Sequence, residues 1–350
     1  MWRMDRKQMV KNKKYIIRFL LFLSCLYFIH LVISSVEIFG QYSVVFNTNA
    51  TRENNEYALT FLEFKDPEAF KMDENNIFYI DYSEVSSLGT GNDKSYYPIT
   101  IGLSSLRIIQ GFENGQNIEL REIFVANADW FVSHITEDGF WMVPHDKIFG
   151  PHKLVAPWPS AMAQGLGISV LVKAYYLTEN IIYLNAARLA SQTYSMSILE
   201  NGFKSDYDGR TIYEEYPIKE NPPHILNGYI FSLLGLYDLS KAIDDNKIEK
   251  LFLEGVDNVE NILEDFDAGF WSYYSLSDVS NVRNHYRLSS PMYQKLHVQQ
   301  LKALHSITNR EKFIEYALIF EKQHDGWFSF IIYPIYAVYK DFTYLYKKLV

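Results

Sequence analysis

Two stretches of this 350-residue chain combine residue types that can move protons. The first, residues 200–225, contains Glu214, Glu215, Tyr216 and Pro217 in succession. A carboxylate and a phenol can act as base and acid on one substrate when both reach it. Because Pro217 disfavours a helix before it, we expect an extended backbone, with Glu215 and Tyr216 on opposite faces. The alternative is a solvent-exposed acidic pair on a hairpin.

The second stretch, residues 267–297, is rich in tyrosine and in cationic side chains. Its candidate anion-binding residues are Arg283, Arg287, Lys295 and His297. Guanidinium and ammonium groups bind anions through charge-assisted hydrogen bonds, so this cluster predicts an anionic ligand. A solvated loop with scattered charge is the alternative.

Other kinds of site are not indicated. The nine histidines show no H-x-x-x-H or H-E-x-x-H spacing, and the single Cys25 excludes a cysteine-based zinc site, so we expect no metal. The chain has no phosphate-binding glycine loop and no G-x-S-x-G motif, and we expect no cofactor. A formal net charge of −9 argues against a nucleic-acid partner. Glycoside hydrolysis by paired carboxylates stays open, because the loops contain many acids.

Four similar loops recur along the chain, and two helical patterns precede each of them. Their glycines lie roughly 60 residues apart and are Gly139, Gly202, Gly269 and Gly326. The predicted helix pairs are 99–112 with 117–135, 160–177 with 180–199, 226–242 with 247–265, and 293–306 with 310–323. The first helix of a pair is apolar on most faces and the second is amphipathic, as expected for an inner and an outer helix. The sequence therefore predicts a mainly α fold, an (α/α) toroid of about four helical hairpins with β-hairpin loops at its mouth. An irregular helical domain that shares turn glycines by chance is the alternative.

The N-terminal region predicts a membrane anchor. Residues 1–18 are strongly basic, and residues 19–36 are uncharged and long enough to cross a bilayer, for which roughly 17–25 apolar residues suffice. We expect a cytoplasmic tail, an uncleaved signal anchor and a lumenal or extracytoplasmic remainder, in the Golgi of a eukaryote or the cell envelope of a prokaryote. A cleaved signal peptide is the alternative.

Three further regions follow the anchor. Residues 37–95 are expected to form a stem with short β structure, because 42–46, 57–64 and 77–82 have strand composition. Residues 96–330 form the predicted helical catalytic domain, and residues 331–350 form a C-terminal extension.

Several motifs in the loops resemble the C-terminal catalytic domain of the D-glucuronyl C5-epimerase family, which modifies heparosan and heparan sulfate. The similar stretches, in the family's order across roughly residues 95–320, are Tyr97–Ile99 (YPI), Ser160–Gly165 (SAMAQG), Tyr213–Pro217 (YEEYP), Leu226–Gly228 (LNG), residues 232–239, and Tyr293 with His297 and Gln300. The resemblance implies an (α/α) barrel, a uronate-containing anionic polysaccharide as substrate, inversion at C5 from glucuronate to iduronate without a cofactor, and a homodimer.

The resemblance also assigns roles to residues of this chain. It implies that Glu215, Tyr216, Tyr274 and Tyr293 are catalytic, with Glu215 and Tyr293 on opposite sides of the sugar, and that Asn227 and Gln164 contact the substrate. The family's arginine three residues after the hairpin tyrosine is Ser277 here, so Arg283 or Arg287 is expected to bind the carboxylate.

Two alternatives to an epimerase remain at this stage. One is a polysaccharide lyase or glycoside hydrolase on the same scaffold; a lyase shares the proton abstraction but expels the C4 oxygen. The other is a membrane-tethered glycan-binding protein that has lost catalysis.

Overall fold

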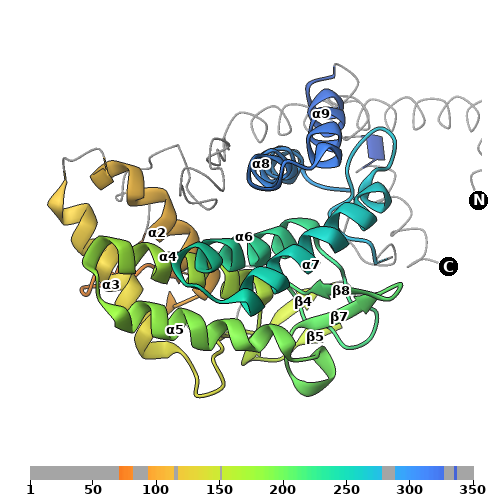
Figure 1. Cartoon of the computed structure of the whole chain (residues 1–350). Helices are drawn as coiled ribbons and strands as arrows, with labels where there is room; N and C mark the ends of the chain where they lie inside the picture. Colours follow the sequence, from red (N-terminus) through yellow and green to blue (C-terminus); the bar gives the residue numbers. More distant parts are fainter. Residues whose placement is uncertain are drawn as a thin grey trace, which may run out of the picture.

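The computed structural model describes residues 71–81, 94–113, 117–149, 152–277, 288–326 and 335–336 (Figure 1). The basic tail, the predicted anchor, the strands predicted at 42–46 and 57–64 and nearly all of the C-terminal extension lie outside these ranges. None of the helices within the described ranges has the length and apolar character that crossing a bilayer requires.

Four helical hairpins follow one another along the chain. They are α2 (Pro98–Glu113) with α3 (Ile118–His134), α4 (Ala161–Thr178) with α5 (Ile181–Gln192), α6 (Leu226–Ala242) with α7 (Asn246–Ile262), and α8 (Pro291–Thr308) with α9 (Glu311–Asp325). Most bounds lie within a few residues of those predicted. Helix α5 is shorter than predicted, because the chain after Gln192 continues as two 3-10 turns, Thr193–Ser195 and Ile198–Glu200.

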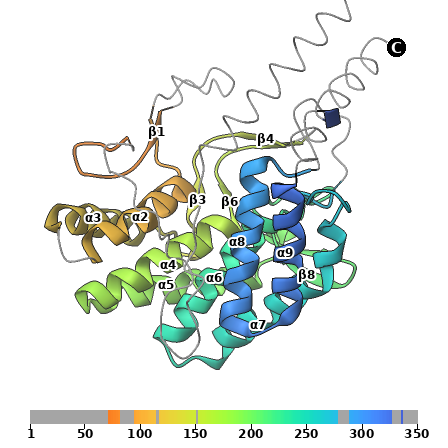
Figure 2. The same ribbon diagram turned by 90° about the horizontal axis from the view of Figure 1, so that it is seen from above.

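Inner and outer helices differ in burial as the sequence predicts. Residues 161–174 of α4 and 226–239 of α6 are buried on every face, whereas α5 and α7 bury one side. Helices α4 and α6 pack against each other, with α2 and α3 on one side of them and α8 and α9 on the other (Figure 2). The prediction of a mainly α fold built from about four helical hairpins is confirmed.

Side-chain caps mark the start of the outer helices α3, α5 and α7. Asn117, Asn180 and Asp245 each accept a hydrogen bond from the backbone N–H two residues later, at 3.0, 3.1 and 2.9 Å. Such a cap satisfies one of the amides that a helix leaves unpaired at its first turn. The connections inside the hairpins are therefore short, and each outer helix turns back directly along its inner helix.

Short antiparallel ribbons fill the connections that lead into the inner helices. The pairs are β1 (Ile80–Asp81) with β2 (Lys94–Ser95), β3 (Met142–Val143) with β6 (Trp158–Pro159), β4 (Lys147–Phe149) with β5 (His152–Leu154), and β7 (Lys204–Tyr207) with β8 (Arg210–Tyr213). Asp208 and Gly209 connect β7 to β8 with φ angles of 50° and 77°, the left-handed pair that suits a two-residue hairpin turn.

The four repeated glycines all follow the end of an outer helix. Gly139 and Gly269 adopt φ angles of 92° and 81°, which favour glycine, and Gly326 ends α9. Because the next inner helix begins after each of the first three loops, these loops lie at the end of the hairpin array where inner helices start.

Helices α4 and α6 approach each other closely at two glycines. A Cβ on Gly165 would collide with the backbone of Phe231 and Ser232, and one on Gly235 would collide with the backbone of Gly165. One turn further along, Ser169 Oγ donates to Asp238 Oδ2 at 2.6 Å. The inner helices therefore cannot keep this separation with any larger residue at either glycine.

We expect Gly165→Ala to lower the free energy of unfolding by about 2–3 kcal/mol, because backbone atoms cannot move aside as a side chain can. Ser240→Ala, on the partly exposed end of α6, is the control and should change it by about 0.5 kcal/mol or less. Chemical denaturation of both variants measures the difference. Equal stabilities would contradict the close helix contact.

Candidate active site

A cavity of about 210 Å³ opens where the inner helices begin. The second residue of every inner helix lines it, namely Ile99, Met162, Asn227 and Met292. The other lining residues are Tyr97, Leu103, Arg107, Lys147, Glu215, Tyr216, Phe231, Tyr293 and Leu296. Equivalent positions of the four repeats therefore converge on one space, and three of the residues predicted to be catalytic lie on its wall.

Glu215 is the buried acid of this cavity. Its side chain lies against the first turn of α6, where a Cβ on Gly228 would be 2.6 Å from both the Cβ and Oε2 of Glu215. Glu215 is 4% exposed, and within the described residues neither its Oε2 nor Asn227 Oδ1 has a hydrogen-bond partner. Buried polar atoms are normally paired, so these two oxygens are available to a bound substrate.

The environment of Glu215 makes it a base suited to neutral pH. Burial raises the pKa of Glu215 to about 7, while hydrogen bonding by Tyr216, the charge of Lys147 and hydrogen bonding by Asn227 act in the opposite direction. The neighbouring charge of Glu214 raises the pKa further. A carboxyl whose pKa lies near the working pH is at its most effective in proton transfer.

Tyrosine hydroxyls surround this carboxyl. Burial raises the pKa of Tyr293 to about 12, the charge of Glu215 adds to the effect, and a hydrogen bond with Tyr274 opposes it. The ring centroids of Tyr274 and Tyr293 lie 4.7 Å apart. Burial also raises the pKa of Tyr216 and of Tyr274 well above the usual range. All three phenols are therefore protonated at neutral pH and can donate hydrogen bonds.

The cavity wall carries two cations that the sequence did not suggest. Lys147 and Arg107 line the cavity, and the Lys147 ammonium lies 5.1 Å from the centre of the Tyr216 ring. Arg283 and Arg287 lie outside the described residues, and Lys295 is absent from the described lining. Sequence reasoning missed Lys147 and Arg107 because neither lies in a motif.

The prediction that Glu215 and Tyr216 point to opposite faces is wrong. Strand β8 ends at Tyr213, so the alternation of a strand does not continue, and both side chains line the same cavity. Glu214 instead points away into a buried network.

Glu214 holds this turn in place. Its Oε1 accepts a hydrogen bond from Ser205 Oγ at 2.5 Å and lies 2.6 Å from His224 Nδ1, and its Oε2 accepts from the His224 backbone N–H at 3.0 Å. The carbonyl of Glu214 also accepts from the Ala161 N–H at the start of α4, at 3.0 Å. The residue next to the candidate base is thereby fixed to the hairpin, to the following loop and to an inner helix.

Gln164, predicted to contact substrate, has a structural position in this molecule. It is fully buried and is not among the residues that line the cavity. Its Oε1 accepts from the Trp141 N–H at 2.9 Å, and its Nε2 donates to the Gly139 carbonyl at 2.8 Å. Gln294 has an equivalent position in α8. Its Oε1 accepts a hydrogen bond from the Ser272 N–H at 2.9 Å, and its Nε2 donates one to the Phe320 carbonyl at 3.0 Å.

The sequence contains a signal for this shared role. Gln164 and Gln294 end the same pattern, S-x-M-x-Q, at residues 160–164 and 290–294. In both copies the methionine lines the cavity and the glutamine connects the preceding loop to an outer helix.

His297 also lies inside the protein rather than on the cavity wall. It is fully buried in α8, its Nδ1 is 3.0 Å from Ser272 Oγ, and burial lowers its pKa to about 3. A neutral histidine adds no positive charge, so it does not extend the anion-binding cluster that the sequence suggested.

Comparison with known proteins identifies the family. A family model described as the D-glucuronyl C5-epimerase C-terminus matches residues 138–322, more than half of the chain. The chain belongs to this family. The match includes every residue to which the resemblance assigned a role, whereas the similar stretch Tyr97–Ile99 lies before it. The resemblance stated from the motifs is confirmed.

Individual relatives show how much of each protein is shared. A D-glucuronyl C5-epimerase of Caenorhabditis elegans is 33% identical over 221 residues, which are 59% of this chain and 34% of the worm protein. An uncharacterized protein of Methanocaldococcus jannaschii is 28% identical over 203 residues, 56% of this chain and 63% of that protein. The chain thus spans about a third of the first relative. An unsaturated glucuronyl hydrolase from Bacillus sp. GL1 superimposes with a TM-score of 0.45 at 16% identity, over 65% of this chain and 62% of that one.

The raised pKa of Glu215 predicts a pH-dependent stability. In the unfolded chain this acid ionises near its ordinary pKa of 4.5, whereas in the folded protein it keeps its proton until about pH 7. The folded state therefore binds the extra proton between these values, and its stability falls as pH rises through this window. Glu215→Gln stays neutral, so we expect it to unfold at a higher temperature than the wild type at pH 8 and at a similar one at pH 4.

The difference at pH 8 corresponds to on the order of 3 kcal/mol. Glu137→Gln, on an exposed turn, is the control and should leave the pH dependence unchanged. A Glu215→Gln profile parallel to that of the wild type would show that the carboxyl is not held in its neutral form.

Proposed function

We propose that this chain is a uronate C5-epimerase, an isomerase that converts D-glucuronate to L-iduronate units within an anionic polysaccharide. The observation that carries the proposal is a buried carboxyl with a pKa of about 7, Glu215, on the wall of the same small cavity as the protonated phenol of Tyr293. Family membership and the name of the worm relative support the same activity.

The chemistry requires two groups that act on opposite faces of one carbon. The C5 proton of a uronate is weakly acidic because the adjacent carboxylate can accept the electron pair as an enolate. Ionised Glu215 takes this proton, the C–H electrons move into the enolate, and Tyr293 returns a proton to the other face. The resulting Tyr293 phenolate is stabilised by its hydrogen bond with Tyr274. Tyr293 then regains a proton from solvent and Glu215 releases one to it, which restores the starting state of both residues.

The remaining wall of the cavity suits the charge that develops. Lys147 and Arg107 supply positive charge where the substrate carboxylate becomes an enolate, and Asn227 offers an amide beside Glu215. Fixed charges in a site that excludes water stabilise such an intermediate far more than they would in solution. This arrangement replaces the arginine that the sequence lacks at Ser277.

The decisive experiment separates the two faces of C5. Incubation with heparosan in heavy water, followed by NMR, reports both inversion and deuterium uptake. We expect Tyr293→Phe and Glu215→Gln to reduce inversion by about 10²-fold or more, because each loses one proton-transfer group while keeping its shape. One of the two variants should still exchange deuterium into uninverted substrate from a single face.

Tyr316→Phe is the matched control, because Tyr316 lies on the outer helix α9, away from the cavity lining, and it should keep full activity. Full inversion by both active-site variants would exclude the assignment. A product that absorbs ultraviolet light would indicate an unsaturated uronate and hence a lyase.

We also propose that residues 19–36 anchor the protein in a membrane, with the basic tail in the cytoplasm and the catalytic domain on the lumenal or extracytoplasmic side. The support is the uncharged run beside a strongly basic flank. We expect the full chain to stay with membranes after a high-salt wash and to retain its N-terminal tail, as mass spectrometry can show. A soluble product that begins near residues 37–42 would instead identify a cleaved signal.

Resemblance to the family further suggests a homodimer, which light scattering of the solubilised protein would test.

A further inference from the structure

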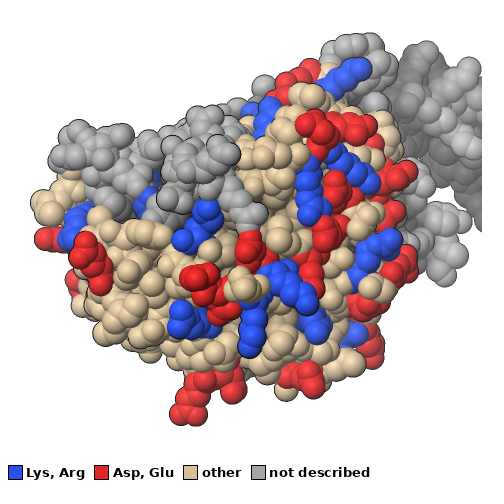
Figure 3. All heavy atoms as spheres, in the orientation of Figure 1, with Lys and Arg blue, Asp and Glu red and all other residues tan. Residues whose placement is uncertain are grey.

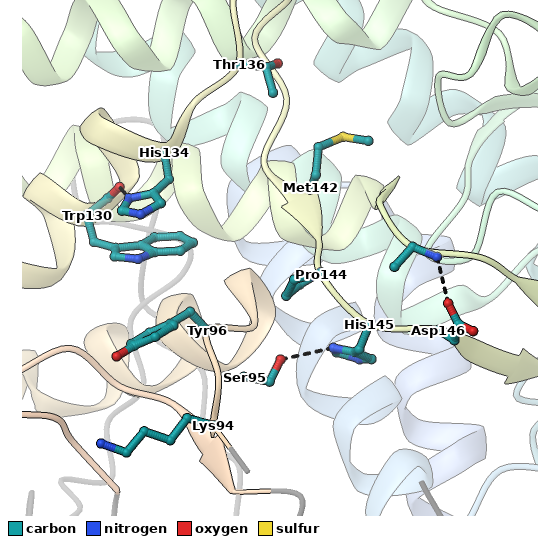
Figure 4. Close-up of a pocket in the computed structure, with 11 residues that line it drawn as sticks. Lys94, Ser95, Tyr96, Trp130, His134, Thr136, Met142, Pro144, His145 and Asp146 are labelled. Atoms are coloured by element: carbon teal, nitrogen blue, oxygen red, sulfur yellow. Dashed lines mark hydrogen bonds between the residues drawn. The ribbon is translucent and has the colours of Figure 1, made fainter. Parts of the chain in front are cut away.

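A second and larger cavity, of about 640 Å³, has a lining that includes none of the residues proposed to be catalytic. Its walls come from three places: residues 94–96, the end of α3 with the turn after it, and residues 142–156 (Figure 4). The lining residues are Lys94, Ser95, Tyr96, Trp130, His134, Thr136, Met142, Pro144, His145, Asp146 and Ala156.

This larger cavity adjoins the candidate active site through two short segments. Tyr96 lines the larger cavity and the next residue, Tyr97, lines the smaller one. Likewise His145 lines the larger cavity and Lys147 lines the smaller one. The ring of Tyr97 meets the ring of His145 edge-on, with centroids 4.8 Å apart. One pair of side chains therefore forms part of the wall between the cavities, which places the two cavities side by side.

Fixed aromatic rings form one side of the larger cavity. Trp130 and His134 are stacked with centroids 4.4 Å apart, and His134 Nδ1 lies 2.9 Å from the Trp130 carbonyl oxygen. The Tyr96 hydroxyl donates to Asp73 Oδ2 at 2.8 Å, which fixes that ring as well. Figure 4 shows Trp130 and Tyr96 extending toward the same space. Rigid, flat and partly polar rings suit the apolar faces of sugars.

The polar groups of the larger cavity suit a sugar within an anionic chain. Burial lowers the pKa of His145, so at neutral pH it offers hydrogen bonds rather than charge, and its Nδ1 lies 3.2 Å from Ser95 Oγ. Asp146 pairs with Lys153 at 2.7 Å, which offsets its negative charge. Lys94 also lines the cavity, and its ammonium lies 4.9 Å from the centre of the Tyr79 ring.

We propose that the larger cavity binds the saccharide unit next to the reacting uronate, in the same polysaccharide chain. The aromatic faces of Trp130 and Tyr96 pack against the sugar ring, His145 forms a hydrogen bond with a sugar hydroxyl, and Lys94 attracts a carboxylate. The identity of the polymer rests on the proposed function; the presence of a second sugar site does not depend on catalysis.

The test uses the full chain, with heparosan polymer and the shortest heparosan oligosaccharide that exchanges deuterium at C5. The variants are Trp130→Leu, which keeps an apolar side chain, and Lys94→Ala, at an exposed position. The matched controls are Tyr176→Leu and Lys250→Ala, both at exposed positions away from the cavity.

We expect Trp130→Leu to weaken polymer binding and raise its KM by about tenfold, and Lys94→Ala by about three- to fivefold, with kcat changed by less than about twofold. The shortest substrate should be unaffected, and the controls should match the wild type. Calorimetric binding of the polymer is measured separately from turnover.

Polymer binding that is unchanged in both folded variants would overturn the sugar site. Equal losses for long and short substrates would do so too, because they would indicate general damage. If the wild type binds polymer without inverting it and the variants bind weakly, the proposed activity fails while the sugar site stands. A wild type that neither binds nor inverts the polymer excludes both.

Discussion

The buried contact between the Glu215 carboxyl and the first turn of α6 is the constraint on which the site depends. The carboxyl fits because position 228 is a glycine, and it is held there because Glu214 is tied to Ser205, His224 and the start of α4. The same burial that makes the position structurally demanding raises the pKa of Glu215 to about 7. Packing and reactivity are thus two consequences of one contact.

The repeat explains how residues far apart in sequence reach this carboxyl. The second residue of each inner helix lines the cavity, while the fourth residue of three of them connects a loop to an outer helix. These fourth residues are Gln164, Tyr229 and Gln294. The Tyr229 hydroxyl lies 2.8 Å from the Thr211 carbonyl oxygen and 3.2 Å from that of Gly255, and either can accept its hydrogen. A single helical pattern therefore supplies both the lining of the site and the connections that keep it in position.

Some of this could be predicted from the sequence, for identifiable physical reasons. The helix pairs were predictable because the difference between a helix apolar on all sides and one with a single apolar face is local in sequence. The opposite orientation expected for Glu215 and Tyr216 was wrong because it assumed a strand that ends at Tyr213. Gln164 was misassigned because a shared motif does not distinguish a residue that lines a cavity from one that supports it. Lys147 could not be found, because only tertiary packing brings it beside Tyr216.

Charge distribution bears on the proposed binding of a polyanion by this acidic protein. The chain carries a formal charge of −9, and acidic and basic side chains are intermixed over the face shown in Figure 3. Attraction over long distances is therefore weak, and screening reduces it further beyond about 8–10 Å at physiological salt. Lys147 and Arg107 instead lie on the wall of a small cavity, where limited access of water strengthens their effect. If the proposed substrate binds here, selectivity for its anionic sugar depends on how deeply the sugar enters the cavity, so its shape and its charge must both fit.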